Sequence, residues 1–90
     1  MQHNPATELQ LTYRDGKFFA AYLYLAEPQG DRRPKTKRLS GSVLLDIDEQ
    51  GNAIGVEILS REGLNADTLN ALLKPFGVRP IQPRELSTAA

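Results

Sequence analysis

The sequence predicts an α+β domain: a four- or five-stranded antiparallel β-meander with one C-terminal helix packed on one face. Two observations support this fold. Before residue 60, apolar and polar residues alternate in short segments separated by Gly and Pro, a pattern typical of strands and turns. From residue 65 the apolar period becomes that of an amphipathic helix, whose stripe is Leu69, Leu72, Leu73 and Phe76. With 90 residues, the chain is expected to form one domain.

The first part of the chain is expected to hold three strands. Residues 1–8 are polar and form a flexible lead-in, followed by a strand at 9–14 and the turn "DGK". Residues 18–25, "FFAAYLYL", are apolar on both faces and therefore belong at the centre of the sheet. Because side chains alternate along a strand, one face is expected to carry Phe18, Tyr22 and Tyr24, and the opposite face Phe19, Leu23 and Leu25. A loop punctuated by Pro and Gly then leads to a short strand at 35–39.

The second part is expected to hold two strands, at 42–48 and 53–59, and then the helix. Asn65 is a suitable N-cap for that helix. Pro75 cannot continue a helix and Gly77 favours a stop, so the helix should end near Lys74. The single domain therefore spans residues 9–77, and residues 78–90 are expected to form an extended, Pro-containing tail.

Residues 46–57 spell most of a calcium-binding loop, with Asp46 first, Asp48 third, Gly51 sixth and Glu57 twelfth. Such a loop joins two helices, whereas the segments on either side here alternate like strands. If their apolar residues face one core, the cross-strand pairs are Val43 with Ile58, Leu45 with Val56, and Ile47 with Ile54. These six residues would form the face that the helix covers.

That register predicts a β-hairpin connected by "QG" or "EQGN", in which Gly51 supplies a positive φ. Asp46 and Glu57 become diagonal neighbours on the outer face, too spread out to surround an ion. We therefore expect no metal site and no cofactor. Replacing Val56 by Asp should unfold the domain.

The same segment resembles the small bacterial family known as domain of unknown function 2283, over about residues 12–60. The matching positions are Tyr22, Tyr24, Asp46, Asp48, Gly51, Asn52, Gly55 and Glu57. The resemblance implies a small antiparallel sheet and brings no activity and no catalytic residues. The chain departs from the family in its basic connection "RRPKTKR" and in the helix and tail after Ser60.

The aromatic side of the sheet is a candidate partner surface, formed by Tyr22, Tyr24, Leu44 and Leu59. A partly apolar sheet face of this kind suggests a homodimer or a partner protein. The alternative is that the tail segment "VRPIQP" covers it.

A basic run, Arg32, Arg33, Lys35, Lys37 and Arg38, is the second candidate surface. It could contact phosphates or an acidic protein. The alternative is a solvated loop and a strand edge blunted by lysines, which the balance of eleven basic and eleven acidic residues favours.

For function, the sequence favours a small non-enzymatic protein-interaction or regulatory module. The alternative is a nucleic-acid-binding accessory factor that uses the basic segment 32–38, and the family resemblance suggests that such a factor would be antitoxin-like. An enzyme built on Asp46, Asp48 and Glu57 has the least support, because no convergent partner is evident and His3 lies near the chain end. The chain has no cysteine, no signal-peptide pattern and no long apolar run. We expect a cytoplasmic protein without a membrane partner.

Overall fold

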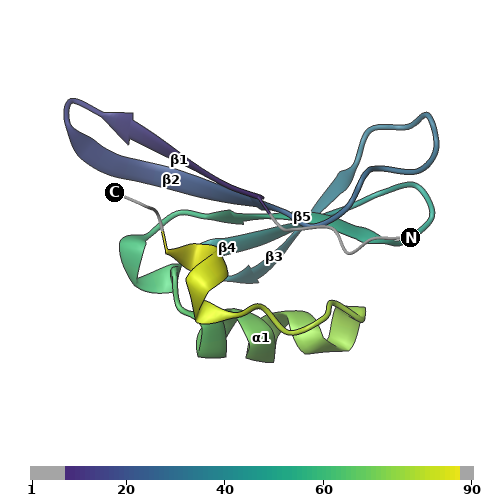
Figure 1. Cartoon of the computed structure of the whole chain (residues 1–90). Coiled ribbons are helices and arrows are strands. Elements are labelled where there is room, and N and C mark those ends of the chain that lie inside the picture. Colours follow the sequence, from purple (N-terminus) through teal and green to yellow (C-terminus); the bar gives the residue numbers. More distant parts are fainter. Residues whose placement is uncertain (1–7, 88–90) are drawn as a thin grey trace.

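The computed structural model describes residues 8–87, which form a five-stranded antiparallel sheet with helices on one side (Figure 1). The strands are β1 (Glu8–Arg14), β2 (Lys17–Tyr24), β3 (Lys35–Ser40), β4 (Val43–Ile47) and β5 (Ala53–Ile58). The helices are α1 (Ala66–Leu73) and the short 3-10 helices η1 (Arg61–Gly63), η2 (Lys74–Phe76) and η3 (Pro83–Leu86). The predicted α+β class is confirmed.

The strand order is β1-β2-β5-β4-β3, which is more complex than a simple meander. β3, β4 and β5 follow one another as a meander, but β2 pairs with β5 and not with β3. Burial explains the arrangement. β5 is buried at four of its six positions and needs a neighbour on both sides, whereas β3 is exposed at its first four positions and suits an edge.

The core lies between the inner face of the sheet and α1. Leu23, Leu45, Val56, Ile58 and Leu69 are all fully buried there. The helix has the predicted boundaries. The Asn65 side-chain oxygen caps its start by accepting from the Thr68 N–H at 2.9 Å, and Gly77 ends the following turn with φ 75°.

The segment after the helix is not merely the extended tail that we expected. Ile81 is only 2% exposed and Leu86 only 9%, and both belong to the hydrophobic core. The Asn70 side chain holds the segment at two points, donating to the Ile81 carbonyl at 3.0 Å and accepting from its N–H at 2.7 Å. The tail thus lies on the helix side of the sheet and leaves the aromatic face uncovered (Figure 1).

A bulge in β2 reverses the faces on which Phe18 and Phe19 were expected to lie. Thr12 pairs with Ala20 but Tyr13 pairs with Phe18, so Phe19 is an extra residue on β2. Phe18 consequently packs against the core, and Phe19 is 45% exposed with the Arg14 guanidinium 4.0 Å from its ring centre. The prediction that Phe18 shares a face with Tyr22 is wrong, because strict alternation fails at the bulge.

A second bulge changes the end of the β4–β5 hairpin. The expected pairs Val43–Ile58 and Leu45–Val56 are confirmed, but Ile47 pairs with Ala53 and not with Ile54. Ala53 therefore packs against the core, while Ile54 is buried outside the main cluster. The connection runs from residue 48 to residue 52, so the expected two- or four-residue turn is also wrong.

Candidate interaction surface

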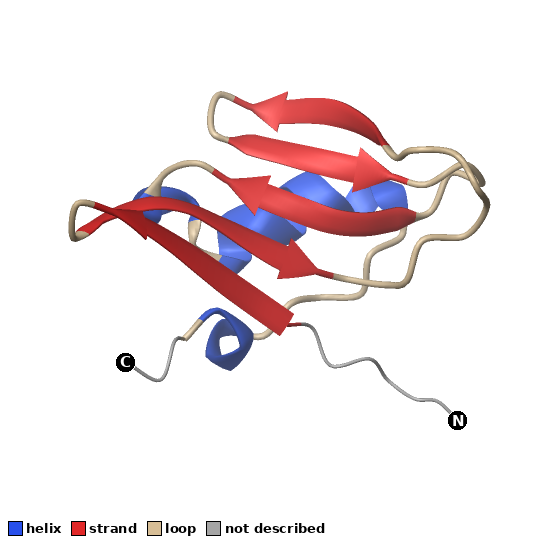
Figure 2. Cartoon of the chain, turned by 90° about the horizontal axis from the view of Figure 1, so that it is seen from above, coloured by secondary structure: helices blue, strands red, loops and turns tan. Residues whose placement is uncertain are grey.

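The outer face of the sheet is covered by no element of residues 8–87, and Figure 2 looks directly onto it, with α1 behind the strands. Tyr22 and Tyr24 lie on this face with their ring centres 4.7 Å apart and their planes at 66°. Leu44 stands across β5 from Tyr22, and Leu59, directly after β5, is 40% exposed. These four predicted partner residues thus share one face, which we call the open face.

Tyr22 anchors the middle of the open face. Its ring lies over Gly55, where a side-chain carbon would overlap the tyrosine hydroxyl and ring edge. Its hydroxyl donates to Asp46 Oδ2 at 2.7 Å, and the other Asp46 oxygen accepts from the Thr36 hydroxyl at 2.7 Å. This chain of contacts ties β2 to β4 and β3 across the glycine of β5.

The environment of Tyr22 keeps its hydroxyl protonated. Burial raises the pKa of Tyr22 well above its usual value, and the hydrogen bond to the Asp46 carboxylate raises the pKa further. Both Asp46 oxygens already accept hydrogen bonds. The pair therefore forms a structural link between strands.

Asp48 organises the turn after β4. One of its oxygens accepts from the backbone N–H groups of Gln50 and Asn52, and the other accepts from the Gln29 N–H at 2.8 Å. Asp48 is only 5% exposed, and burial alone would raise its pKa, but these N–H donors together lower the pKa below its usual value. The carboxylate therefore stays ionised and joins the turn to the β2–β3 loop.

Glu49, for which the sequence pattern predicted no role, holds the same loop. Its Oε1 accepts from the Asp31 N–H at 2.9 Å and the Arg32 N–H at 3.1 Å. Gly30 has φ 94° and lies against the Glu49 side chain, so a side chain there would both strain the backbone and collide. An acid in the turn and a glycine in the loop indicate such a contact only when the strand order is known.

The acids of the calcium-like pattern are thus used in separate hydrogen-bonding roles. Asp46 binds side chains on the open face, whereas Asp48 binds backbone N–H groups in the turn. Glu57 is half-buried on the open face, between Tyr22 on β2 and Leu44 on β4. Among residues 8–87, no group of three or more acidic, His or Cys side chains is positioned to hold a metal. His3 lies outside the described residues.

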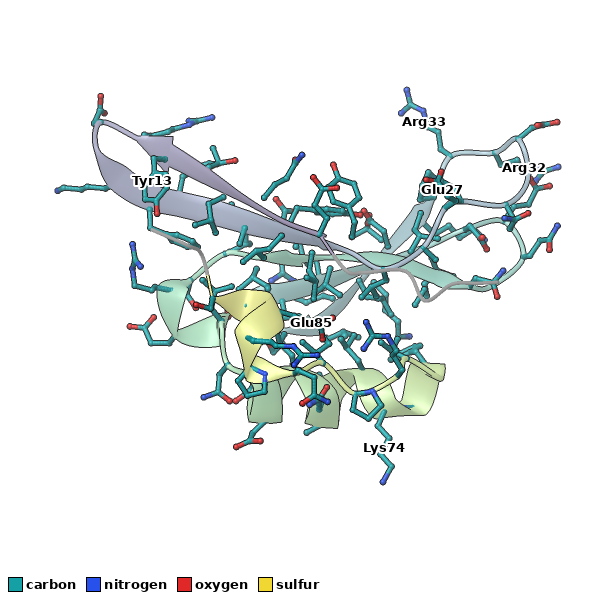
Figure 3. All side chains as sticks on the ribbon, viewed as in Figure 1. Tyr13, Glu27, Arg32, Arg33, Lys74 and Glu85 are labelled. Atoms are coloured by element: carbon teal, nitrogen blue, oxygen red, sulfur yellow. The ribbon has the colours of Figure 1, made fainter. Side chains whose placement is uncertain are left out.

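The predicted basic run does not form one surface. Lys35 and Lys37 pair with Ile47 and Leu45, which places both lysines on the helix side of β3. Arg38 pairs with Leu44 on the open face and donates to the Gly41 carbonyl at 3.0 Å. Arg32 and Arg33 lie in the β2–β3 loop, and Figure 3 shows them projecting there, well away from α1. Nucleic-acid binding by these residues stays a prediction.

Comparison with known proteins supports the resemblance seen in the sequence. Residues 20–60 match the family described as "Protein of unknown function (DUF2283)". The match covers a little under half of the chain, from within β2 to just beyond β5, and omits β1, α1 and the tail. Searches of the curated proteins and of the solved structures found no match. Across residues 8–87, no helix has the length and apolar character needed to cross a membrane.

The matched segment contains the hydrogen-bonded parts just described. Tyr22, Asp46 and Gly55 fit one another on the open face, and Asp48 with Asn52 closes the turn. Gly51 has φ 87° in that turn. Most positions that carry the family resemblance therefore have a role in building the sheet, while Tyr24 is partly exposed.

Proposed function

We propose that this protein is a small, non-enzymatic interaction module that binds a partner protein on the open face of its sheet, and that it works in the bacterial cytoplasm. The observation that carries the proposal is the exposure of apolar side chains on a rigid face that no described element covers. Tyr24 is 43% exposed and Leu59 is 40% exposed. Large apolar side chains at a rigid, accessible surface are typical of interface centres.

The rigidity of the open face supports this role. The link from Tyr22 through Asp46 to Thr36 crosses the four strands β2, β5, β4 and β3. A surface held in this way loses little conformational entropy when a partner binds, which favours affinity.

The use of the carboxylates supports a non-enzymatic role. Asp46 and Asp48, two of the acids in the calcium-like pattern, accept hydrogen bonds within the protein on both of their oxygens. Tyr22 is held in its neutral form by burial and by Asp46, which raise its pKa. Each group has a structural task that a catalytic role would have to interrupt.

The proposal is tested by comparing what the wild type and two open-face variants capture from a lysate of the source organism. The variants are Tyr24→Glu and Leu59→Glu, and Ala71→Glu on the exposed side of α1 is the matched control. We expect a protein retained by the wild type and the control to be lost from both open-face variants. All four proteins should melt within a few degrees of one another.

Quantitative mass spectrometry of the captured proteins gives the answer. A partner that both open-face variants retain as well as the control does would contradict the proposal. So would a wild type that captures nothing above the level of an unrelated bait.

A further inference from the structure

The two edges of the sheet differ in how well they are protected against pairing. The β3 edge carries Lys35 and Lys37 on the inner face, where they stand beside Ile47 and Leu45, and Pro34 precedes the strand. Inward-pointing charges and an adjacent proline are common devices against edge-to-edge association. The β3 edge therefore has protection of its own.

Within its described residues the β1 edge has neither of these two devices, and η3 contacts β1 from the helix side of the sheet. Glu8–Arg14 contains no lysine and no proline, and its two charges lie only at its two ends. On its inner face Leu9 and Leu11 pack against the core but remain partly exposed. Tyr13 is 51% exposed, and Figure 3 shows it near the end of the β1–β2 hairpin that projects beyond the helices.

We propose that two copies of this chain pair through β1, antiparallel and related by a two-fold axis at Leu11, so that their sheets become continuous. Directly opposed residues of an antiparallel pair lie on the same face of the sheet. The two-fold axis must therefore pass between one residue and the same residue of the other copy. With Leu11 on the axis, Glu8 of each copy faces Arg14 of the other. This register also sets Leu9 against Tyr13, which covers the exposed ring.

The positions of the two charges fit this register. Glu8 pairs with Tyr24 and so lies on the open face. Arg14 lies on the same face, because its guanidinium rests 4.0 Å from the ring centre of the exposed Phe19. Opposite charges facing each other across a strand pair stabilise it, and this dimer contains the pair twice.

The neighbouring registers lose these contacts. With Gln10 on the axis, Glu8 would face Thr12, and with Thr12 on the axis, Arg14 would face Gln10. Each alternative also shortens the strand overlap by two residues. The Leu11 register is the one that uses all seven residues of β1 and pairs both charges.

The interface is separate from the open face, so this inference and the proposed partner binding can fail independently. In the dimer the two open faces would lie side by side on one continuous sheet. A single partner could then contact both, or two partners could bind together.

The first experiment exchanges the charges and measures the association of the full chain by sedimentation equilibrium. Glu8→Arg and Arg14→Glu each set like charges opposite one another twice, so each should weaken the dimer by about tenfold or more. The double variant Glu8→Arg/Arg14→Glu restores opposite charges and should regain most of the affinity. Arg33→Glu, which makes the same charge change in the β2–β3 loop, should leave the dimer unchanged.

A wild type that stays monomeric at millimolar concentration would overturn the proposal. A dimer that survives both single reversals would do the same, as would a double variant no better than the singles.

The second experiment determines the register by disulfide formation. The chain has no cysteine, so Gln10→Cys and Thr12→Cys each introduce one thiol on the exposed face of β1. In the Leu11 register residue 10 faces residue 12 of the other copy, so a refolded mixture of the two variants should cross-link on oxidation. Either variant alone would offer only diagonal neighbours, roughly 7–8 Å apart, at or beyond the reach of a disulfide.

Efficient cross-linking of Gln10→Cys alone would instead place the axis at residue 10, and that of Thr12→Cys alone at residue 12. Either result would overturn the proposed register. No cross-link in the mixture would overturn β1 as the interface.

Discussion

The inner and outer faces of the β4–β5 hairpin are stabilised in different ways. On the inner face, Leu45 and Val56 are fully buried and contribute through apolar packing, which many residues of similar size could provide. On the outer face, Gly55, Tyr22 and Asp46 fit through one close approach and directed hydrogen bonds. The recognisable motif of this segment therefore lies in the close approach and directed hydrogen bonds of the outer face, which tolerate few substitutions.

The largest effect is expected on the inner face. Val56→Asp buries an unpaired charge among apolar side chains, at a cost of about 5 kcal/mol or more, comparable with the whole unfolding free energy of a domain of this size. Circular dichroism should show an unfolded or aggregated protein, whereas Leu59→Asp on the outer face should remain folded. A soluble Val56→Asp protein with an unchanged spectrum would refute the assignment of this face.

The next effect is expected at the glycine of the outer face. Gly55→Ala places a methyl group where the Tyr22 ring lies, so the ring must move, at a cost of about 2 kcal/mol for overpacking. A double-mutant cycle isolates the cause. With Tyr22→Ala already present, Gly55→Ala should cost little, because the collision has been removed. If Gly55→Ala cost the same stability in both backgrounds, its effect would not come from a collision with Tyr22.

The turn should respond to pH through Asp48. Its pKa is lowered in the folded protein, so the ionised carboxylate contributes stability above the ordinary pKa of 3.8 and loses that contribution as the pH falls below it. Asp48→Asn should lower the melting temperature by several degrees at pH 7. The difference from the wild type should narrow progressively below about pH 4. If the difference in melting temperature stayed constant with pH, the lost stability would come from the altered shape of the side chain and not from the missing charge.

A smaller effect is expected for the Tyr22 hydroxyl. Tyr22→Phe removes its hydrogen bond to Asp46 and should cost about 1 kcal/mol, or roughly 4–8 °C in melting temperature. Because the folded pKa of Tyr22 is raised above 10.0, the wild type should also lose stability as the pH rises past 10.0. Alkaline titration of the variant should show less of this loss. If the wild type and the variant lost stability equally at alkaline pH, the loss would not come from the Tyr22 hydroxyl.

The smallest effect is expected for calcium. A site of micromolar affinity would add about 4 kcal/mol at a thousandfold excess of the ion. Because Asp46 and Asp48 already accept hydrogen bonds from the protein, millimolar calcium in place of a chelator should leave the melting temperature unchanged. A rise of several degrees that disappears in Asp46→Asn would reinstate the metal site.

The sequence by itself determined the features that depend on neighbouring residues. Period two placed the strands, and period 3.6 with the Asn65 cap and Gly77 stop placed the helix within a residue or two. The shared apolar face determined the register of β4 and β5 as far as Leu45 and Val56. The motif positions Tyr22, Asp46 and Gly55 were also visible as a group. Their contact was not, because it joins residues on three different strands.

Only the tertiary structure decided the rest. The pairing of β2 with β5, the two bulges and the docking of Ile81 and Leu86 each depend on which buried surfaces meet. The bulges put Phe19 outside and Ala53 inside, against the alternation of the sequence. Local patterns state which side chains prefer to be buried. The free energy that selects among strand orders and registers comes from contacts between distant segments, and no short stretch of sequence contains it.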